Sequence, residues 1–308
     1  MNPKISVIML TYNRENLVER AILSVLSQTF ADFEYIIVDN GSTDDSGKIA
    51  DKFADRDSRI RVIHRDKGSI GSGRNTGLYA AKGDYIAFID DDDRCEPDFL
   101  EFLFVLAAGN GADVSICGGK VDGKDFQECE KEIMTAEEAV IELMWRKKYN
   151  MAFPTKLFSR EMAEKIRFPK EDKYDDITRM HMLLAQANKV AYHGLPKYTF
   201  YRHDSNNSAW TTNHNLIDSD ILDEYLRAYK ERTAWLAELF PNSAAIWRYF
   251  EWSFMISMLE KVARLEIKNC EQQSKNMLRE LRKNSSEFLN CEWIQGFEKG
   301  WMDKYVLT

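Results

Sequence analysis

The stretch GDYIAFIDDDD, residues 83–93, joins a short apolar run to four consecutive aspartates. The apolar run at residues 85–89 predicts a buried β-strand, and Asp90, Asp91, Asp92 and Asp93 follow it directly. Two like charges about 4 Å apart repel by about 4 kcal/mol at an effective dielectric constant of about 20, and a divalent cation held by carboxylate oxygens relieves that repulsion. The alternative is a solvated acidic turn that caps a helix beginning near Pro97. The position at a strand end favours the cation site.

The segments around this stretch alternate between strand and helix patterns. Strands are predicted at residues 5–10, 33–38, 59–64, 114–117 and 198–203, and helices at residues 15–28, 46–53 and 77–82. Residues 118–131 are expected to form a loop or a short hairpin. This alternation predicts an α/β fold, in which helices flank a mostly parallel, Rossmann-like sheet.

Polar residues follow two further strands of this predicted sheet. The first strand ends in TYNR at residues 11–14, and the second ends in DNGS at residues 39–42. Ligands of open α/β sheets bind beyond the carboxyl ends of the strands. The two polar stretches and the aspartate run are therefore predicted to line one site.

A glycine cluster, GSIGSGRNTG at residues 68–77, lies between two predicted strands. Its spacing does not match the dinucleotide-binding fingerprint, which requires Gly-x-Gly-x-x-Gly in the first strand-to-helix turn. We expect a flexible turn before a helix. Arg74 and Asn75 at the start of that helix would favour an anion, because helix amino termini and guanidinium groups both bind phosphate.

A second acidic pair, Asp175 and Asp176, precedes an amphipathic helix in which Ile177, Met180 and Leu184 share one face. Acidic residues at a helix start are often caps. The functional alternative is a general base, for which a carboxylate kept ionised by the helix dipole is suited.

The composition is that of a large soluble protein, with 308 residues, 44% hydrophobic and 30% charged. A net charge of -8 argues against a general nucleic-acid binder. The five cysteines include no Cys-x-x-Cys pair, which is typical of reduced cytosolic thiols. The apolar run near the amino terminus is too short for a signal peptide, and no segment is long and apolar enough to span a membrane. A cytoplasmic protein is expected.

The chain is predicted to divide into an α/β domain at residues 1–210 and a helical region at residues 211–308. The second region has long helical periodicity and five of the seven tryptophans. Residues 246–258 carry apolar side chains on nearly every side, which is typical of a buried helix. The alternatives are an acceptor platform, a homodimer surface or an interfacial membrane contact, since tryptophan and tyrosine favour that boundary.

Five segments, in order along the first 93 residues, closely resemble the family 2 glycosyltransferases of bacteria, which have the GT-A fold. They are SVI with TYNR at 6–14, SVLSQTF at 24–30, IIVDNGSTD at 36–44, GRNTG at 73–77 and AKGDYIAFIDDDD at 81–93. The likeness continues more loosely through residues 156–158, 168–169, 174–176 and 201–202, and fades after about residue 208.

The resemblance implies roles for individual residues. The donor, a UDP-sugar, would be bound by Thr11, Tyr12, Asn13, Arg14, Asp39, Arg74, Asp90 and Asp91. Of these, Tyr12 and Asp39 match residues that hold the uracil base. Asp92 matches the carboxylate that coordinates a divalent cation, Mn²⁺ or Mg²⁺. Asp176 matches the catalytic base of inverting members, while Asp175 stands where the family usually has glutamate. Arg202, His203 and Ser208 would steady the diphosphate.

The family would make this chain an inverting, metal-dependent enzyme that transfers a sugar to a hydroxyl of a glycan or lipid-linked acceptor in surface polysaccharide synthesis. A lipid-linked acceptor fits peripheral association with the inner face of the cytoplasmic membrane. The alternative is a non-catalytic sugar-nucleotide-binding or scaffold protein of the same fold. A sugar-nucleotide pyrophosphorylase is disfavoured, because the loop after the first strand holds Tyr12 instead of a glycine-rich, basic sequence.

Overall fold

The computed structural model describes residues 2–121, 124–125, 130–168, 175–203 and 218–308. The chain divides into two compact units, Met1–Arg202 and His203–Thr308. The predicted boundary after residue 210 lies in a stretch outside the described residues.

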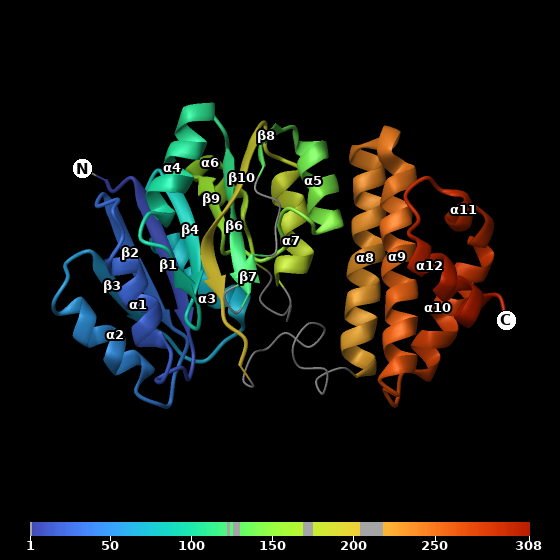
Figure 1. Cartoon of the computed structure of the whole chain (residues 1–308). Helices are drawn as coiled ribbons and strands as arrows, with labels where there is room; N and C mark the ends of the chain where they lie inside the picture. The colour runs from blue at the N-terminus through green and yellow to red at the C-terminus, as the bar shows by residue number, and fades with distance from the viewer. Residues whose placement is uncertain (1, 122–123, 126–129, 169–174, 204–217) are drawn as a thin grey trace. The chain divides into compact units, whose positions relative to one another are not determined.

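Four parallel strands form the first half of the sheet in the α/β unit (Figure 1). They are β1 (Ile5–Thr11), β2 (Phe33–Asp39), β3 (Ile60–His64) and β4 (Tyr85–Asp90), in the order β3-β2-β1-β4. Most apolar side chains of β1, β2 and β4 are buried, on both faces of the sheet, as expected for parallel strands covered by helices. Each strand lies within one or two residues of its predicted position.

The second half of the sheet is mixed. Strand β9 (Lys156–Ser159) runs antiparallel between β4 and β6 (Val114–Val121), and β10 (Val190–Phe200) is parallel to β6. The short strands β5 (Arg94–Cys95), β7 (Lys124–Asp125) and β8 (Lys131–Met134) add antiparallel pairings at its margin. The predicted α/β class is confirmed, with parallel pairing within β1–β4 and between β6 and β10.

Helices cover both faces of this sheet. On one face Val7 and Met9 of β1 pack in a core cluster with α1 (Val18–Leu26), α2 (Ser46–Ala54) and α4 (Phe99–Asn110). On the other face lies α3 (Ile70–Ala80). The remaining helices of the unit are α5 (Ala136–Trp145), α6 (Arg160–Lys165) and α7 (Asp175–Leu184).

Helix α3 contradicts the expected flexible turn at residues 68–76. The helix begins at Ile70, where the Ser69 hydroxyl caps it by accepting a hydrogen bond from the Ser72 N–H at 3.1 Å. A Cβ added at Gly73 would overlap Leu10, and one at Gly77 would overlap Ile8. The glycines therefore allow close packing of a helix on β1 and are not a source of loop flexibility.

The second unit is helical in its described part. It contains α8 (Ser219–Leu239), α9 (Ala244–Arg264), α10 (Glu271–Lys283), α11 (Ser285–Asn290) and α12 (Gly296–Trp301), with a short 3₁₀ helix η2 (Pro241–Ser243) and a short π-helix η3 (Met302–Val306). Trp247, Tyr249 and Trp252 of α9 are all buried, so the interpretation of residues 246–258 as a buried helix is confirmed. Among the described helices, none has a stretch sufficiently long and apolar to cross a bilayer.

Candidate active site

The carboxyl ends of β1, β2 and β4 meet at one edge of the sheet, as predicted from their polar endings. The parallel register pairs Thr11 with Asp39 and Leu10 with Asp90. Two of the three polar stretches are thus direct neighbours of the end of β1, and the candidate site is built on this edge.

The loop after β1 is tied to the loop after β2 by hydrogen bonds. Asn13 adopts a left-handed conformation, with φ of 53°, which asparagine tolerates better than most residues. Its N–H donates to the Ser42 hydroxyl at 3.1 Å, and its side-chain oxygen accepts from the Thr43 N–H at 2.8 Å. The Arg14 N–H donates to the Ser46 hydroxyl at 2.7 Å. Asn13 therefore fixes the two loops relative to each other.

Asp39 is buried at the end of β2, and both of its carboxylate oxygens accept hydrogen bonds. One oxygen accepts from the Ser42 N–H at 3.0 Å, and the other lies 3.0 Å from Nδ1 of His64. Nε2 of His64 lies 2.9 Å from a carboxylate oxygen of Asp51. These two contacts raise the pKa of His64 above its usual value. His64 was not among the predicted site residues.

The four aspartates after β4 divide into two kinds. Asp91 and Asp93 are buried, whereas Asp90 and Asp92 are partly exposed. Burial raises the pKa of Asp91 to about 7, and the neighbouring charge of Asp92 adds to this effect. Burial likewise raises the pKa of Asp93 well above its usual value, and the charges of Asp90 and Asp92 raise it further. The run thus gathers four acidic groups at the end of β4, and its partly exposed members alternate with its buried ones.

The buried pair of aspartates holds neighbouring backbone in place. Asp91 accepts a hydrogen bond from the Tyr12 N–H at 3.3 Å and lies 3.7 Å from Nε of Arg14. Asp93 accepts from the Tyr201 N–H at 2.9 Å. The structure therefore places Asp91 beneath the loop after β1, where it supports Tyr12 and Arg14.

Arg74 and Asp90 lie next to each other, with 3.4 Å between Nη2 and a carboxylate oxygen. The Arg74 guanidinium also lies 5.2 Å from the ring of Phe153 and 5.7 Å from that of Phe168. Asn75 binds the backbone of Phe168 through both of its amide atoms, at 2.7 and 3.1 Å. Arg74 was expected at the first turn of its helix. Arg74 instead lies beyond the first turn of α3, which begins at Ile70. At this position the residue offers a phosphate its guanidinium group, and not a backbone N–H of the helix amino terminus.

Arg20 and Tyr201 join the segment after β10 to the aspartate run. Nη2 of Arg20 donates to the carbonyl of Asp92 at 2.5 Å, and the guanidinium lies 3.9 Å from the centre of the Tyr201 ring. Arg20 was missed by sequence reasoning, since it lies within an ordinary amphipathic helix. Three residues were predicted to steady the diphosphate. Arg202 follows Tyr201 in the chain and is exposed, and His203 is the first residue of the second unit. Ser208 lies outside the described residues.

Asp176 lies in the first turn of α7, where one carboxylate oxygen accepts from the Ile177 N–H at 2.9 Å. The predicted helix face is confirmed, because Ile177, Met180 and Leu184 are buried. The side chain of Asp175 lies outside the described residues.

A buried lysine, Lys156 of β9, lies within electrostatic reach of Asp176. Its ammonium group donates to the carbonyls of Asn150 and Ala152, at 2.9 and 2.6 Å. Burial lowers the pKa of Lys156 to about 7, against the opposing effects of Cys117 and Asp176. In the sequence Lys156 is the charged residue that begins the segment KLF, which resembles the family only loosely and carries no assigned role.

Replacing Lys156 with methionine is expected to change the pH dependence of stability. Between about pH 7 and the usual lysine pKa near 10.5, the unfolded chain binds a proton that the folded chain does not. The free energy of unfolding of the wild type should therefore rise with pH there, by up to about 1.4 kcal/mol per pH unit. Urea denaturation at pH 7, 8 and 9 would measure this slope. Lys156→Met should lose it, and the partly exposed control Lys165→Met should keep it; an equal slope in all three proteins would contradict the prediction.

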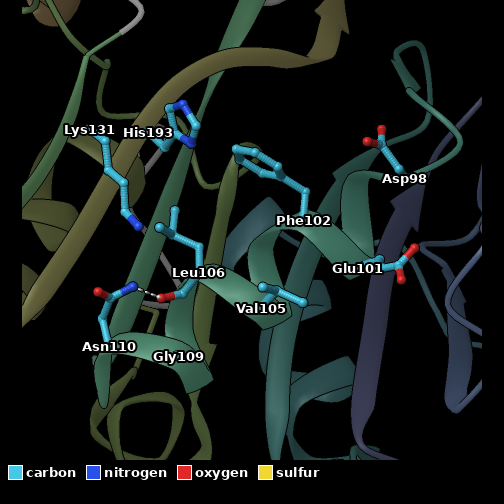
Figure 2. A pocket seen from close by; sticks show the side chains of 9 residues that line it. All are labelled: Asp98, Glu101, Phe102, Val105, Leu106, Gly109, Asn110, Lys131 and His193. Carbon is cyan, nitrogen blue, oxygen red and sulfur yellow. Dashed lines mark hydrogen bonds between the residues drawn. The ribbon is translucent and has the colours of Figure 1, made fainter.

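A pocket of about 400 Å³ lies away from these loops, along α4. Figure 2 shows its lining, in which Phe102 and Leu106 of α4 lie near His193 of β10 and Lys131 of β8. Its lining in the described chain includes none of the predicted site residues. This hollow is therefore not the candidate active site, which is the loop-lined edge described above.

No group of three or more histidine, cysteine, aspartate or glutamate side chains within the described ranges is arranged as a ready-made metal site. A cation at Asp90 and Asp92 would need further ligands. Mg²⁺ commonly has this arrangement, taking one or two carboxylates together with substrate phosphates and water.

Comparisons with known proteins identify the family of the chain. The model of glycosyl transferase family 2 matches residues 6–167. The glycosyltransferase GlyG of Streptococcus pneumoniae is 32% identical over 206 residues, which cover 62% of this chain and 68% of GlyG. EpsH of Bacillus subtilis is 31% identical over 217 residues, covering 65% of this chain and 61% of EpsH. The chain thus spans about two thirds of the length of these relatives.

A solved structure, Staphylococcus aureus TarS residues 1–349 in complex with UDP-GlcNAc, superimposes with a TM-score of 0.70. The superposition covers 91% of this chain and 81% of that one at 20% identity, so it bears on the fold alone. The predicted GT-A architecture with added carboxyl-terminal helices is confirmed. The chain belongs to glycosyl transferase family 2 and is a glycosyltransferase.

Proposed function

We propose that this glycosyltransferase transfers a sugar from a UDP-sugar to a hydroxyl of a glycan or lipid-linked acceptor, with inversion at the anomeric carbon and with a divalent cation. The observation that carries the proposal is the register of β1, β2 and β4, which brings Asp39 and Asp90 to either side of the end of β1. Asp39 lies on one side as an acceptor for a base, and Arg74 stands beside Asp90 on the other side. A nucleoside diphosphate could span these groups.

The aspartate run fits a divalent cation by the chemistry of its oxygen atoms and by its charge. Asp92, with Asp90 beside it, would hold the ion, while Arg14 lies close to the buried Asp91. When bound, the ion would neutralise the negative charge of the departing diphosphate. Arg74 is placed to bind and orient the same phosphates through its guanidinium.

Asp176 would act as the general base that takes the proton from the acceptor hydroxyl. Its place in the first turn of α7 favours the ionised carboxylate through the helix dipole. When Lys156 carries its proton, its charge acts in the same direction. A base that accepts a proton from the attacking hydroxyl requires no covalent intermediate with the enzyme, and attack in line with the leaving group inverts the anomeric centre. TarS, whose structure holds UDP-GlcNAc, supports the choice of a UDP-sugar as the donor class.

Nucleotide release from a panel of UDP-, GDP-, CDP- and dTDP-sugars, with Mn²⁺ or with EDTA, would test this proposal. We expect release from at least one UDP-sugar in Mn²⁺ and at least tenfold less in EDTA. Release from only the other nucleotide classes would contradict the donor assignment. UDP binding that is equally tight with and without Mn²⁺, accompanied by no turnover, would instead favour the non-catalytic alternative.

A further inference from the structure

His64 connects the base-binding carboxylate of the proposed site to a second carboxylate outside it. It is the last residue of β3 and lies opposite Asp39 in the parallel register with β2. Nδ1 is 3.0 Å from Oδ2 of Asp39, and Nε2 is 2.9 Å from Oδ1 of Asp51 on α2. The imidazole is therefore held from both sides, although half of its surface is exposed.

Both contacts are hydrogen bonds only when both ring nitrogens carry a proton. A neutral imidazole has one donor and one acceptor, so it would face one of the two carboxylates with a lone pair. Within the described chain, the charged groups that act on the ring are Asp39 of β2 and Asp51 of α2. Both favour the imidazolium and raise the pKa of His64 above its usual value.

Helix α2 approaches this pair closely at Gly47. A Cβ there would lie 2.6 Å from Oδ2 of Asp39 and 3.2 Å from Cε1 of His64. The absence of a side chain at Gly47 leaves room for the contact between them. Asp39 of β2 and His64 of β3 thus meet beside the backbone of α2, and this close approach limits the orientations open to the Asp39 carboxylate.

Two hydrogen bonds orient the Asp39 carboxylate, one from the Ser42 N–H and one from His64. An ionised carboxylate has about four acceptor sites and no donor, so it can still accept a further N–H. Uracil presents such an N–H at N3, whereas cytosine presents a lone pair at the same ring position. A fixed, ionised Asp39 would bind the first and repel the second.

We propose that His64 is a positioning residue for donor binding: its imidazolium, oriented by Asp51, fixes Asp39 as the acceptor that selects uracil over cytosine. This inference rests on the proposed function, because it takes Asp39 as the contact to the base. His64 does not touch the reacting atoms, so it should act on donor affinity and not on the chemical step.

Two variants separate the two hydrogen bonds of His64. His64→Phe keeps a flat ring but removes both donors. The Kd for UDP is expected to rise about tenfold, because the loss of one hydrogen bond to a charged group has about this effect on affinity. In His64→Asn the amide N–H can replace Nδ1 toward Asp39, and the Kd should stay within about threefold of the wild type. The kcat of both variants at saturating donor should stay within about twofold of the wild type.

The experiment is calorimetric titration with UDP and with CDP, in the presence of Mn²⁺, between pH 6.5 and 8.5. As the pH rises and His64 loses its proton, the affinity of the wild type for UDP should fall. It should fall more than the affinity of His64→Asn, whose side chain does not titrate. This comparison cancels the titration of UDP itself. The preference for UDP over CDP should shrink in His64→Phe. His193→Asn, a substitution at the pocket of Figure 2, serves as the control and should match the wild type.

NMR titration of the imidazole in the free protein provides a readout that does not depend on the nucleotide. The pKa of His64 should lie above 6.5 in the wild type and fall in Asp51→Asn. UDP binding that is unchanged in His64→Phe, or a wild-type pH response equal to that of His64→Asn, would overturn this inference alone. A wild-type protein that binds no UDP would overturn the proposed donor class and this inference with it.

Discussion

Replacing Asp176 with asparagine should lower kcat about 10²- to 10⁴-fold, the usual contribution of a general base. Asparagine has nearly the same shape as aspartate, and its oxygen can still accept the hydrogen bond from the Ile177 N–H. The first turn of α7 should therefore persist, while the capacity to take a proton from the acceptor is lost. Steady-state transfer with a saturating UDP-sugar would measure kcat, and UDP titration should give a Kd within about twofold of the wild type.

A helix-start aspartate outside the catalytic unit offers a matched control. Asp218 caps α8 by accepting from the Ile221 N–H at 2.8 Å, and asparagine caps a helix about as well. Asp218→Asn should therefore leave kcat unchanged. Normal turnover in Asp176→Asn would contradict its assignment as the base. A large rise in the Kd for UDP in that variant would instead indicate a role in donor binding.

The features of the sheet that are predicted correctly are those that depend on local sequence. An apolar run followed by polar residues predicts both a strand and its end, so the edge that carries Thr11, Asp39 and Asp90 could be located before any contact was known. The antiparallel direction of β9 could not be predicted in this way, because its pairing with β4 and β6 depends on contacts between residues distant in the sequence.

The glycine cluster shows how a local signal can mislead. Glycine is the usual residue of turns, so the cluster at residues 68–77 predicts a turn. Gly73 and Gly77 are instead selected by Leu10 and Ile8 of β1, with which any larger residue would overlap. A turn and a tightly packed helix call for the same residue, and only the position of β1 distinguishes them.

Lys156 and His64 were missed for a related reason. Lys156 lies in a segment that resembles the family only loosely, and His64 lies in none of the quoted segments; each acquires its role from partners elsewhere in the chain. Lys156 binds the carbonyls of a preceding loop, and His64 meets Asp39 through strand pairing. Groups that support a site in this way are visible once the register of the strands is known.

Replacing Asp92 with asparagine should lower transfer at saturating donor about 10²- to 10³-fold, the usual cost of removing one preorganised group that stabilises developing charge. The neutral amide is a poor ligand for a hard divalent cation, and the diphosphate would then leave without full neutralisation. The stimulation of UDP binding by Mn²⁺ should also be lost. Titration of UDP with and without Mn²⁺, together with steady-state transfer, would measure both effects.

The adjacent aspartate provides the sharpest control for this prediction. Asp93 is buried, and its pKa is raised well above the usual range by burial and then by Asp90 and Asp92, so a neutral amide resembles the protonated acid. Asparagine can also keep the hydrogen bond from the Tyr201 N–H. Asp93→Asn should therefore retain Mn²⁺-dependent transfer within about fivefold of the wild type. If Asp92→Asn kept its response to Mn²⁺ while Asp93→Asn lost it, the cation would have to be assigned to the buried Asp93. Exposure of the carboxylate would then not identify the metal ligand.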